Sequence, residues 1–258
     1  MLLTTYHHFQ NIYKMKKIVI VLCFLGLFLS KSFGQNEIRF GFQFSPTLSW
    51  MKTDSKRVSN NGGLILGAKL GAVGEYYFRE NYSIASGIGF GFNHSGRLKY
   101  QDAGSYWVNS DLSITGLDTL ASGVSLKYNL QYVEIPVSLK LRSGYFGTFR
   151  VFAELPMLYL GFKTQAKGTI TGNSPGPDTE KENISPDVSF FNLSWGIGGG
   201  FEYELGSKTA LVGGLYYQQG FSDVTKDDGF YIDSTGAVKS ENSKATLGTF
   251  IIRMGVMF

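Results

Sequence analysis

The sequence predicts an all-β protein whose eight strands form one antiparallel transmembrane β-barrel with up-and-down connections. Three observations support this fold class. Eight long segments alternate apolar and polar residues, which places each kind on its own face of a strand. Short connections alternate with long ones, and the last strand ends on an aromatic residue, Phe258. Transmembrane barrels combine these features, because their outer face must be apolar over its height and aromatic at its rims.

The N-terminal residues have the pattern of a secretory signal peptide spanning 1–34. A basic start at Met15 is followed by an apolar run of twelve residues, which is too short to span a bilayer at about 20 residues. Ser32 and Gly34 are the small residues that precede a cleavage site, so we expect cleavage after Gly34. The alternative is a buried N-terminal helix. Residues 1–14 carry no pattern, and we interpret them as an over-extended start.

Cleavage would leave residues 35–258 as one domain with balanced charge. The signal contains four lysines and no acid, so the 24 basic residues fall to 20 and equal the 20 acidic residues. The basic character of the whole chain therefore gives no reason to expect a nucleic-acid partner. The only cysteine leaves with the signal, and one of three histidines remains. These counts argue against disulfides, thiolate chemistry and histidine–cysteine metal sites, and no cofactor is expected.

The first four strands are expected near 37–50, 63–78, 82–95 and 126–142. Each has one continuous apolar face, whereas charged and small residues occupy the other. In the fourth strand, for example, Ile135 and Val137 alternate with Glu134 and Ser138. The apolar faces consist, strand by strand, of Ile38, Phe40, Phe42 and Phe44; of Leu64, Leu66, Ala68, Leu70, Ala72, Tyr76 and Phe78; of Tyr82, Ile84, Ile88, Phe90 and Phe92; and of Val133, Ile135, Val137, Leu139 and Leu141.

The other four strands are expected near 148–163, 188–205, 208–221 and 250–258. The fifth alternates less cleanly, with Met157 and Tyr159 assigned to the apolar outer face. The sixth is clear, and the seventh is ambiguous in phase. The outer face of the fifth strand consists of Val151, Ala153, Leu155, Met157 and Tyr159, and that of the sixth strand consists of Phe191, Leu193, Trp195, Ile197, Phe201 and Tyr203. The outer face of the eighth strand consists of Phe250, Ile252, Met254, Val256 and Phe258.

The connections predict the orientation of the barrel. Short turns lie at 79–81, 143–147 and 206–207, and the long loops lie at about 51–62, 96–125, 164–187 and 222–244. Outer-membrane barrels have short periplasmic turns and long extracellular loops, and an even strand number returns both termini to the periplasm. A soluble lipocalin-like barrel is the alternative, since alternation alone does not tell the inner face from the outer one.

Nine charged residues share the predicted inner face and form a candidate lumen charge network. The interior of an eight-stranded barrel is only wide enough for side chains to fill, so we expect these charges to pair and close it. The alternative is a transport path through a wet gap. The nine are Arg39, Lys69, Glu75, Glu134, Lys140, Arg142, Glu154, Glu202 and Arg253.

One strand resembles a known family. The residues from Tyr132 through Glu134 and Pro136 to Lys140 are similar to the Tyr-x-Glu-hydrophobic-Pro-x-x-x-Lys strand of PorT-like outer-membrane barrels. Phe40-Gly41-Phe42, the glycines 196–200 and the final Phe258 also resemble that family, across the mature chain. The resemblance implies a barrel of the OmpA/OmpX type with Phe258 as the signal read by the barrel-insertion machinery. The founding member's association with type IX secretion implies an accessory role in secretion as one alternative.

Two further features are interpreted as structural. Pro136 and Pro156 lie equally far from the middle of the 143–148 turn, so we expect them to face each other, both inward, beside a bulge. The glycine run 196–200 lies within a strand and no helix follows, so it is no phosphate cradle. We expect the glycine run to let neighbouring strands approach closely or to leave room for a large side chain inside the barrel.

Candidate chemistry is sparse. His94-Ser95 invites comparison with lipid deacylases, but those enzymes use a His-x-Ser spacing that puts both residues on one face, so we interpret His94 as an interfacial polar residue. Carboxylate pairs such as Glu134 with Glu154 are interpreted as structural. Asp223, Asp227, Asp228 and Asp233 do not match a calcium-loop spacing. The loop aromatics Tyr106, Trp107, Phe230 and Tyr231 are expected contact points for a partner or a surface glycan.

The sequence therefore predicts a monomeric, non-enzymatic barrel in the outer membrane, surrounded by lipid and handled by the insertion machinery. Its role would be structural or would consist of holding an envelope or secretion partner through the outer loops. A small porin and, more distantly, a lipid-modifying enzyme are the alternatives.

Overall fold

A computed structural model describes residues 38–258 except 61, 115–116 and 207–208. The predicted signal peptide lies outside the described residues. Among the residues that are described, no helix has the length and apolar character needed to cross a membrane.

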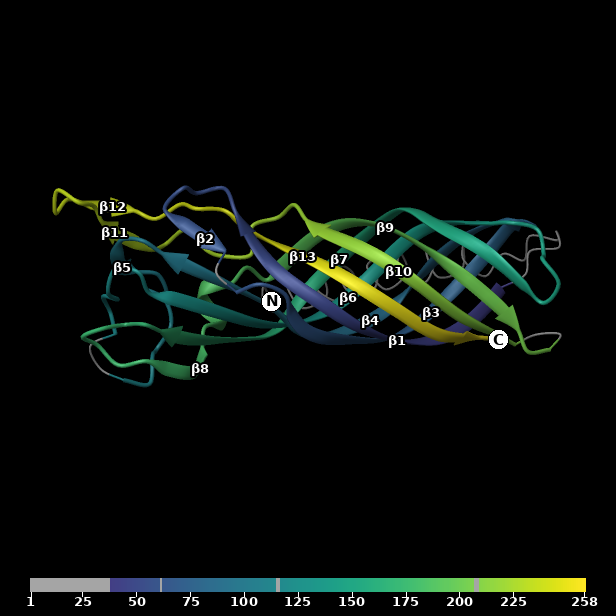
Figure 1. The fold of residues 1–258 in the computed structure, drawn as a ribbon, viewed down its shortest axis with the longest axis horizontal. Coiled ribbons are helices and arrows are strands. Elements are labelled where there is room, and N and C mark those ends of the chain that lie inside the picture. The colour runs from purple at the N-terminus through teal and green to yellow at the C-terminus, as the bar shows by residue number, and fades with distance from the viewer. Residues whose placement is uncertain (1–37, 61, 115–116, 207–208) are drawn as a thin grey trace, which may run out of the picture. The chain divides into compact units, whose positions relative to one another are not determined.

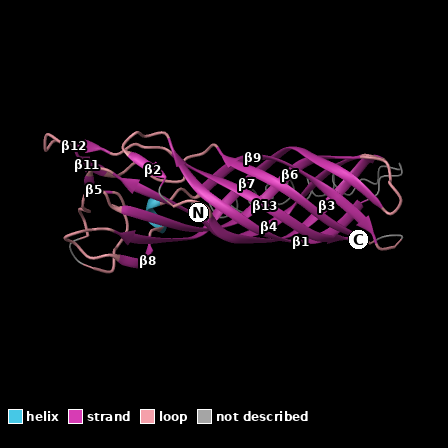
Figure 2. Cartoon of the chain, in the orientation of Figure 1, coloured by secondary structure: helices cyan, strands magenta, loops and turns pink. Residues whose placement is uncertain are grey.

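Eight long strands close into one antiparallel barrel, which confirms the predicted fold class (Figures 1 and 2). Each strand pairs with the next along the chain, and the ring closes where β1 pairs with β13, for example Phe42 with Val256. The barrel strands are β1 (Ile38–Thr53), β3 (Ile65–Arg79), β4 (Tyr82–Tyr100), β6 (Ser125–Arg142), β7 (Phe149–Thr171), β9 (Phe191–Glu204), β10 (Ala210–Gly220) and β13 (Ala245–Met257).

The two ends of the barrel differ. At the turn end, the connections 80–81, 143–148 and 205–209 are short, and the backbones of Phe40 and Phe258 exchange hydrogen bonds of 3.2 and 2.7 Å. At the loop end, the long connections contain further elements. These are β2 (Val58–Asn60), β5 (Ala103–Ser105), β8 (Thr179–Asn183), the 3-10 helix η1 (Ser185–Asp187), β11 (Phe230–Ile232) and β12 (Val238–Ser240).

An apolar belt surrounds the barrel. On β9 the outward side chains are apolar from Phe191 to Tyr203, which is roughly 40 Å along the strand at about 3.3 Å per residue. At the strand tilt of about 45° typical of such barrels, the belt is about 28 Å high, close to the roughly 25 Å that a membrane requires. Lys52 on β1 and Lys99 on β4 are exposed beyond its loop-end edge. The belt therefore has the dimensions of a bilayer core.

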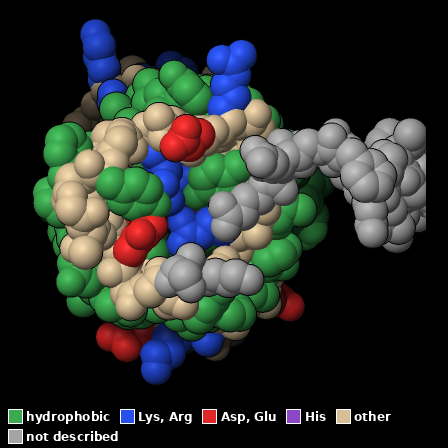
Figure 3. Space-filling model, turned by 90° about the vertical axis from the view of Figure 1, so that its right-hand side faces the viewer, with side chains coloured by type: hydrophobic (Ala, Val, Ile, Leu, Met, Phe, Trp, Pro, Cys, Tyr) green, Lys and Arg blue, Asp and Glu red, His purple; other side chains and the backbone are tan. Residues whose placement is uncertain are grey.

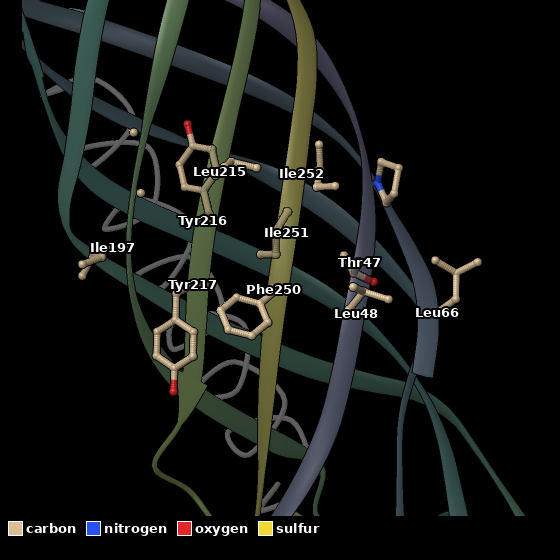
Figure 4. Close-up of a pocket in the computed structure, with 13 residues that line it drawn as sticks. Thr47, Leu48, Leu66, Ile197, Leu215, Tyr216, Tyr217, Phe250, Ile251 and Ile252 are labelled. Carbon is tan, nitrogen blue, oxygen red and sulfur yellow. The ribbon is translucent and has the colours of Figure 1, made fainter. Parts of the chain in front are cut away.

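A shallow apolar groove of about 670 Å³ crosses this belt over β3, β1, β13, β10 and β9 (Figure 4). Exposed Leu66, Leu215 and Phe250 are among its lining residues. Because the groove lies within the belt and offers almost no polar groups, we regard it as part of the acyl-chain surface.

The hydrophobic pattern inverts at the loop end, and the inversion creates a second core. On β6 the outward residues from Leu141 to Val133 are apolar, whereas outward Gln131 and Lys127 are polar. The inward residues change the opposite way, from Lys140 and Glu134 to Tyr132, Leu130, Tyr128 and Leu126, all four of which are buried. This pattern is that of a soluble protein. β4, β6 and β7 therefore leave the bilayer and continue around a protein core.

We call this region the cap: the loop-end parts of β1, β4, β6, β7 and β13, together with β2, β5, β8, η1, β11, β12 and the loops that connect them. The predicted ends of the third and fifth strands, at 95 and 163, were too early, because β4 runs to Tyr100 and β7 to Thr171. The cap core packs the following buried residues together: Met51, Val58, Leu98, Tyr100, Tyr106, Trp107, Leu117, Leu120, Val124, Leu126, Tyr128, Leu130, Tyr132, Ala166, Ile170, Ile184, Val188, Val224, Ala245 and Leu247.

A bulge in β7 corrects the predicted phase of the fifth strand. The register between β6 and β7 shifts between Ser138 opposite Met157 and Lys140 opposite Glu154, so Leu155 and Pro156 both lie on the outside. Beyond the bulge, Met157 and Tyr159 are buried inside the barrel, and their assignment to the outer face was wrong. Pro136 lies opposite Tyr159, so the predicted pair of facing, inward prolines was also wrong.

A second bulge, in β4, changes the direction of His94. Phe92 faces outward, Asn93 adopts a left-handed φ of 56°, and the pairing with β6 shifts between Gly91 and His94. His94 consequently points into the interior and is 2% exposed. Its interpretation as an interfacial residue was wrong, because one extra residue in a strand reverses every side chain that follows.

Candidate functional site in the lumen and the cap

The structure places all nine predicted network residues on the inner face of the barrel. Eight are buried and Arg253 is largely so. They lie at three levels between the turn end and the cap, and every one of them has an ion-pair partner. Pairing is the arrangement that makes charge tolerable in a narrow, poorly hydrated interior.

The level nearest the turn end, which we call the turn-end cluster, is centred on Glu202. This carboxylate is fully buried and accepts hydrogen bonds from Lys140 Nζ at 2.5 Å, from Arg142 Nη2 at 2.8 Å and from Arg150 Nε at 2.9 Å. Arg39 Nη1 lies 3.7 Å from the same carboxylate. Four cationic side chains from β1, β6 and β7 therefore converge on one acid from β9.

The second acid of the turn-end cluster is Glu75. Lys140 Nζ donates to it at 2.7 Å, Arg142 also pairs with it, and the Tyr77 hydroxyl donates to it at 3.0 Å. The guanidinium of Arg142 lies 4.4 Å from the centre of the Tyr77 ring, a cation–π arrangement. The cluster comprises Arg39, Glu75, Lys140, Arg142, Arg150 and Glu202.

The middle level pairs Glu154 with Arg253. Their closest contact is 3.0 Å, and the Ser138 and Tyr216 hydroxyls also donate to Glu154, at 3.1 and 2.9 Å. The Arg253 guanidinium lies 3.7 Å from the centre of the Tyr216 ring. Gly198 makes this possible, because a Cβ there would come within 1.9 Å of that ring. The glycine run thus provides room for a large inward side chain.

The upper level joins Lys69 to Glu134. The ammonium group donates to Glu134 at 2.5 Å and to Gln218 Oε1 at 2.6 Å, and Gln218 in turn donates to Ser194 at 2.7 Å. The family-like motif residues Glu134 and Lys140 are therefore both ion-paired, at different levels, and Tyr132 lies in the cap core above them. Pro136 lies on the same inward face of β6, between Glu134 and Lys140.

His94 and Ser95 do not form a catalytic pair. The ring of His94 packs edge-on against Tyr132 at 6.2 Å, and its Nε2 has no hydrogen-bond partner among the described residues. The Ser95 hydroxyl donates instead to Asn93 Oδ1 at 2.7 Å. A serine nucleophile needs its base within hydrogen-bond reach, so this pair lacks the geometry for acyl transfer.

Several members of the interior network were not selected from the sequence. Arg150 alternates with the outward Val151 on β7, and this alternation indicated that its side chain points inward. The alternation did not indicate that Arg150 would pair with Glu202. Tyr216 and Gln218 belong to the seventh strand, whose phase was ambiguous until its neighbours fixed it. Partner identity depends on cross-strand register, which no single strand encodes.

The cap is held together by carboxylates as well as by its core. Asp187 accepts hydrogen bonds from the backbone N–H of Asn109 at 3.0 Å and from the Ser110 hydroxyl. Glu182 accepts the backbone N–H of Ser113 at 2.8 Å. Loops distant in sequence are thereby tied together. The expectation that Tyr106 and Trp107 are exposed contact points was wrong, since they are 6% and 4% exposed within the cap core.

A small polar pocket of about 110 Å³ opens in the cap between three loops. Arg57 lies over the Tyr231 ring at 4.4 Å and pairs with Asp102 at 3.3 Å. Glu241 lines the same pocket and is hydrogen-bonded to the backbone N–H of Ser243 at 2.9 Å. Burial, reinforced by the nearby acids Asp227 and Asp223, raises the pKa of Glu241.

The raised pKa has a consequence for stability. The folded cap binds a proton at Glu241 more readily than the unfolded chain does, so this residue makes the cap less stable as pH rises from the ordinary carboxyl range through the raised value. At neutral pH, the burial of the Glu241 carboxyl group therefore lowers the free energy of unfolding of the cap.

The acidic loop residues have structural roles. Asp233 closes the β11–β12 hairpin by accepting the N–H of Thr235 and of Ala237 at 2.9 and 3.0 Å. Asp223 accepts the N–H of Thr225 and of Ala245, each at 3.0 Å. Within the described ranges, no three acidic, histidine or cysteine side chains are grouped as a metal site would need.

The profile of the outer membrane protein beta-barrel domain family matches residues 33–226, which is more than half of the chain. The chain belongs to this family. The family description places the chain among outer-membrane β-barrel proteins, in agreement with the apolar belt and the charged interior. No protein of curated function matches the chain.

Several solved barrels are similar to this family member in fold. A major outer membrane protein from Thermus thermophilus shares 16% identity, with 86% of this chain and 100% of that chain covered and a TM-score of 0.40. Neisserial surface protein A shares 12%, with 84% and 95% covered and a TM-score of 0.38. The outer membrane protease OmpT from Escherichia coli shares 8%, with 87% and 96% covered and a TM-score of 0.36.

Proposed function

We propose that this outer-membrane barrel is a closed, non-enzymatic scaffold that presents its cap to an envelope or secretion partner. In this proposal residues 1–34 are removed as a signal peptide, Phe258 is read by the insertion machinery, and the turn end faces the periplasm. The exposed position of Phe258 on the belt side of the turn end supports that reading.

The observation that carries the proposal is the closure of the lumen. Three levels of ion pairs fill the barrel, and the cap core lies directly above the upper pair, Lys69 and Glu134. A conducting pore needs a continuous polar gap, and a plug of paired side chains beneath an apolar core argues against one. A porin role would require both the ion-paired side chains of the lumen and the cap core to move.

The cap supports partner binding because it is built as a folded unit. Its loops share a hydrophobic core and are joined by the carboxylates Asp187 and Glu182. A rigid surface loses less conformational entropy on binding than a mobile loop does. The resemblance of the Tyr132–Lys140 strand to PorT-like barrels makes a secretion accessory the alternative partner-binding role.

Closure is tested by recording currents from the mature protein, residues 35–258, in planar lipid bilayers. We expect no stable single-channel conductance. Neutralising the upper pair in the variant Lys69→Met/Glu134→Gln is the matched comparison, because it removes charge from the lumen and leaves the cap core unaltered. A steady conductance of the wild-type protein that changes in this variant would refute the closed-scaffold proposal.

Partner binding is tested by site-specific cross-linking in intact cells. The mature chain contains no cysteine, so a single cysteine at Val238, which is 67% exposed on β12, can carry a photo-cross-linker. A cysteine at Glu80, in an exposed turn at the opposite end, is the matched control. We expect a discrete adduct at Val238 that is absent at Glu80. Equal labelling at both positions, or none at either, would contradict a cap-specific partner.

A further inference from the structure

The turn-end cluster carries more positive than negative charge. Its cations are Arg39, Lys140, Arg142 and Arg150, whereas its described acids are Glu75 and Glu202. The middle and upper levels are balanced, since each pairs one cation with one carboxylate. Among the described residues this cluster therefore has two more cations than acids, and the half-buried Glu204 lies on the same face of β9 at the turn end.

The two least satisfied cations of the cluster are Arg39 and Arg150. Arg39 reaches Glu202 only at 3.7 Å, which is longer than a hydrogen bond, and its side chain is also hydrogen-bonded to Tyr77. Arg150 uses its Nε for Glu202, and its terminal nitrogens make no hydrogen bond to any described residue. Because both guanidiniums approach the same carboxylate, they lie close together with donors left over.

These two side chains keep a small exposed fraction. Arg39 and Arg150 each remain 7% exposed, whereas Glu202 beneath them is fully buried. A view onto the turn end shows Lys and Arg side chains in the middle of this face, with acidic side chains beside them (Figure 3). The nearby acid Glu204 does not neutralise them within ion-pair distance, and the Tyr145 hydroxyl donates to it instead. The Tyr145 ring covers one side of Arg150 at 4.8 Å.

We propose that the turn-end mouth of the lumen is a binding site for a phosphate group, held by Arg39 and Arg150 above Glu202. A buried excess of charge is costly unless an opposite charge compensates it. A phosphate group supplies up to two negative charges, and the planar fork of an arginine matches its oxygens with two parallel hydrogen bonds. The same oxygens are offered by free phosphate and, with one negative charge in place of two, by the phosphodiester headgroup of a phospholipid.

The site is tested by phosphate binding to the purified mature barrel in a non-ionic detergent. Isothermal titration with inorganic phosphate at constant ionic strength, with chloride as the balancing anion, measures affinity and stoichiometry. We expect one saturable site and a phosphate-dependent rise in melting temperature. The Arg39→Gln and Arg150→Gln variants should each lose at least about tenfold in affinity, because each removes one charge-assisted, forked contact. Arg79→Gln, an exposed arginine at the same end, is the control.

Arg39→Gln keeps the test interpretable if Arg150→Gln fails to fold, since Arg39 makes no short contact with Glu202. A second titration with a short-chain phosphatidylglycerol, compared with phosphatidylcholine, distinguishes a headgroup from free phosphate. Tighter binding of the glycerol lipid assigns the site to a headgroup, and tighter binding of inorganic phosphate assigns it to the free anion. The proposal is overturned if phosphate and chloride act alike, or if Arg79→Gln weakens binding as much as Arg39→Gln does.

Discussion

Replacing Glu202 by glutamine should be the most damaging single change in the lumen. The substitution keeps the shape of the side chain and removes the charge on which four cations converge. At an effective dielectric constant of about 20, each close pair contributes about 4 kcal/mol before desolvation is subtracted. Removing one partner from a buried ionic network typically costs about 3–5 kcal/mol, because the remaining charges stay buried without compensation. We therefore expect Glu202→Gln to destabilise the barrel by about 3–5 kcal/mol.

The assay is reversible urea unfolding of the mature barrel in lipid vesicles, followed by the fluorescence of its three tryptophans. The midpoint should fall at an unchanged slope, since the surface exposed on unfolding is the same. Glu204→Gln is the matched control, because Glu204 lies two residues away on the same face of β9, is only half-buried and accepts a hydrogen bond from Tyr145. The reasoning is refuted if Glu202→Gln loses less than about 1 kcal/mol, the range of exposed ion pairs.

Three further perturbations test the belt and the cap. Leu215→Arg places a charge on the lipid face and should cost about 2–4 kcal/mol near the bilayer midplane in the same urea assay; no loss would mean that this face is not in lipid. Trp107→Ala should destabilise the cap by about 3–5 kcal/mol by leaving a cavity in its core. Limited proteolysis should then cut the cap loops faster while the barrel stays intact. Glu241→Gln should make the cap more resistant to proteolysis at neutral pH and flatten its loss of stability between acidic and neutral pH. An unchanged pH profile would mean that Glu241 is not the titrating group.

The two cap predictions have internal controls in the same loops. Val108→Ala removes an exposed apolar side chain next to Trp107 and should leave proteolysis unaltered. Asp102→Asn, in the same pocket as Glu241, removes a half-exposed carboxylate already paired with Arg57, so it should not stabilise the cap at neutral pH. A cap that responds equally to each member of these pairs would show only general sensitivity to mutation.

The sequence alone determined the closed barrel, the order of its strands and the inward side of the nine charges. Alternation with a period of two is a local property, so residues such as Phe40 and Phe42 identify their face without knowledge of any neighbour. The same locality explains what was missed. Alternation says which face is apolar but not whether lipid or protein covers it, so the buried stripe of Leu126 and Leu130 was not recognised as part of a cap.

Only the tertiary structure decided which charges meet, and where the pattern reverses. The convergence of Arg39, Arg142 and Arg150 on Glu202 requires the registers of four strands at once. The bulges that turn His94 and Met157 inward arise where one strand has a residue more than its partner. Both are relations between strands, fixed by hydrogen bonding across the closed sheet, and therefore beyond what any one segment can specify.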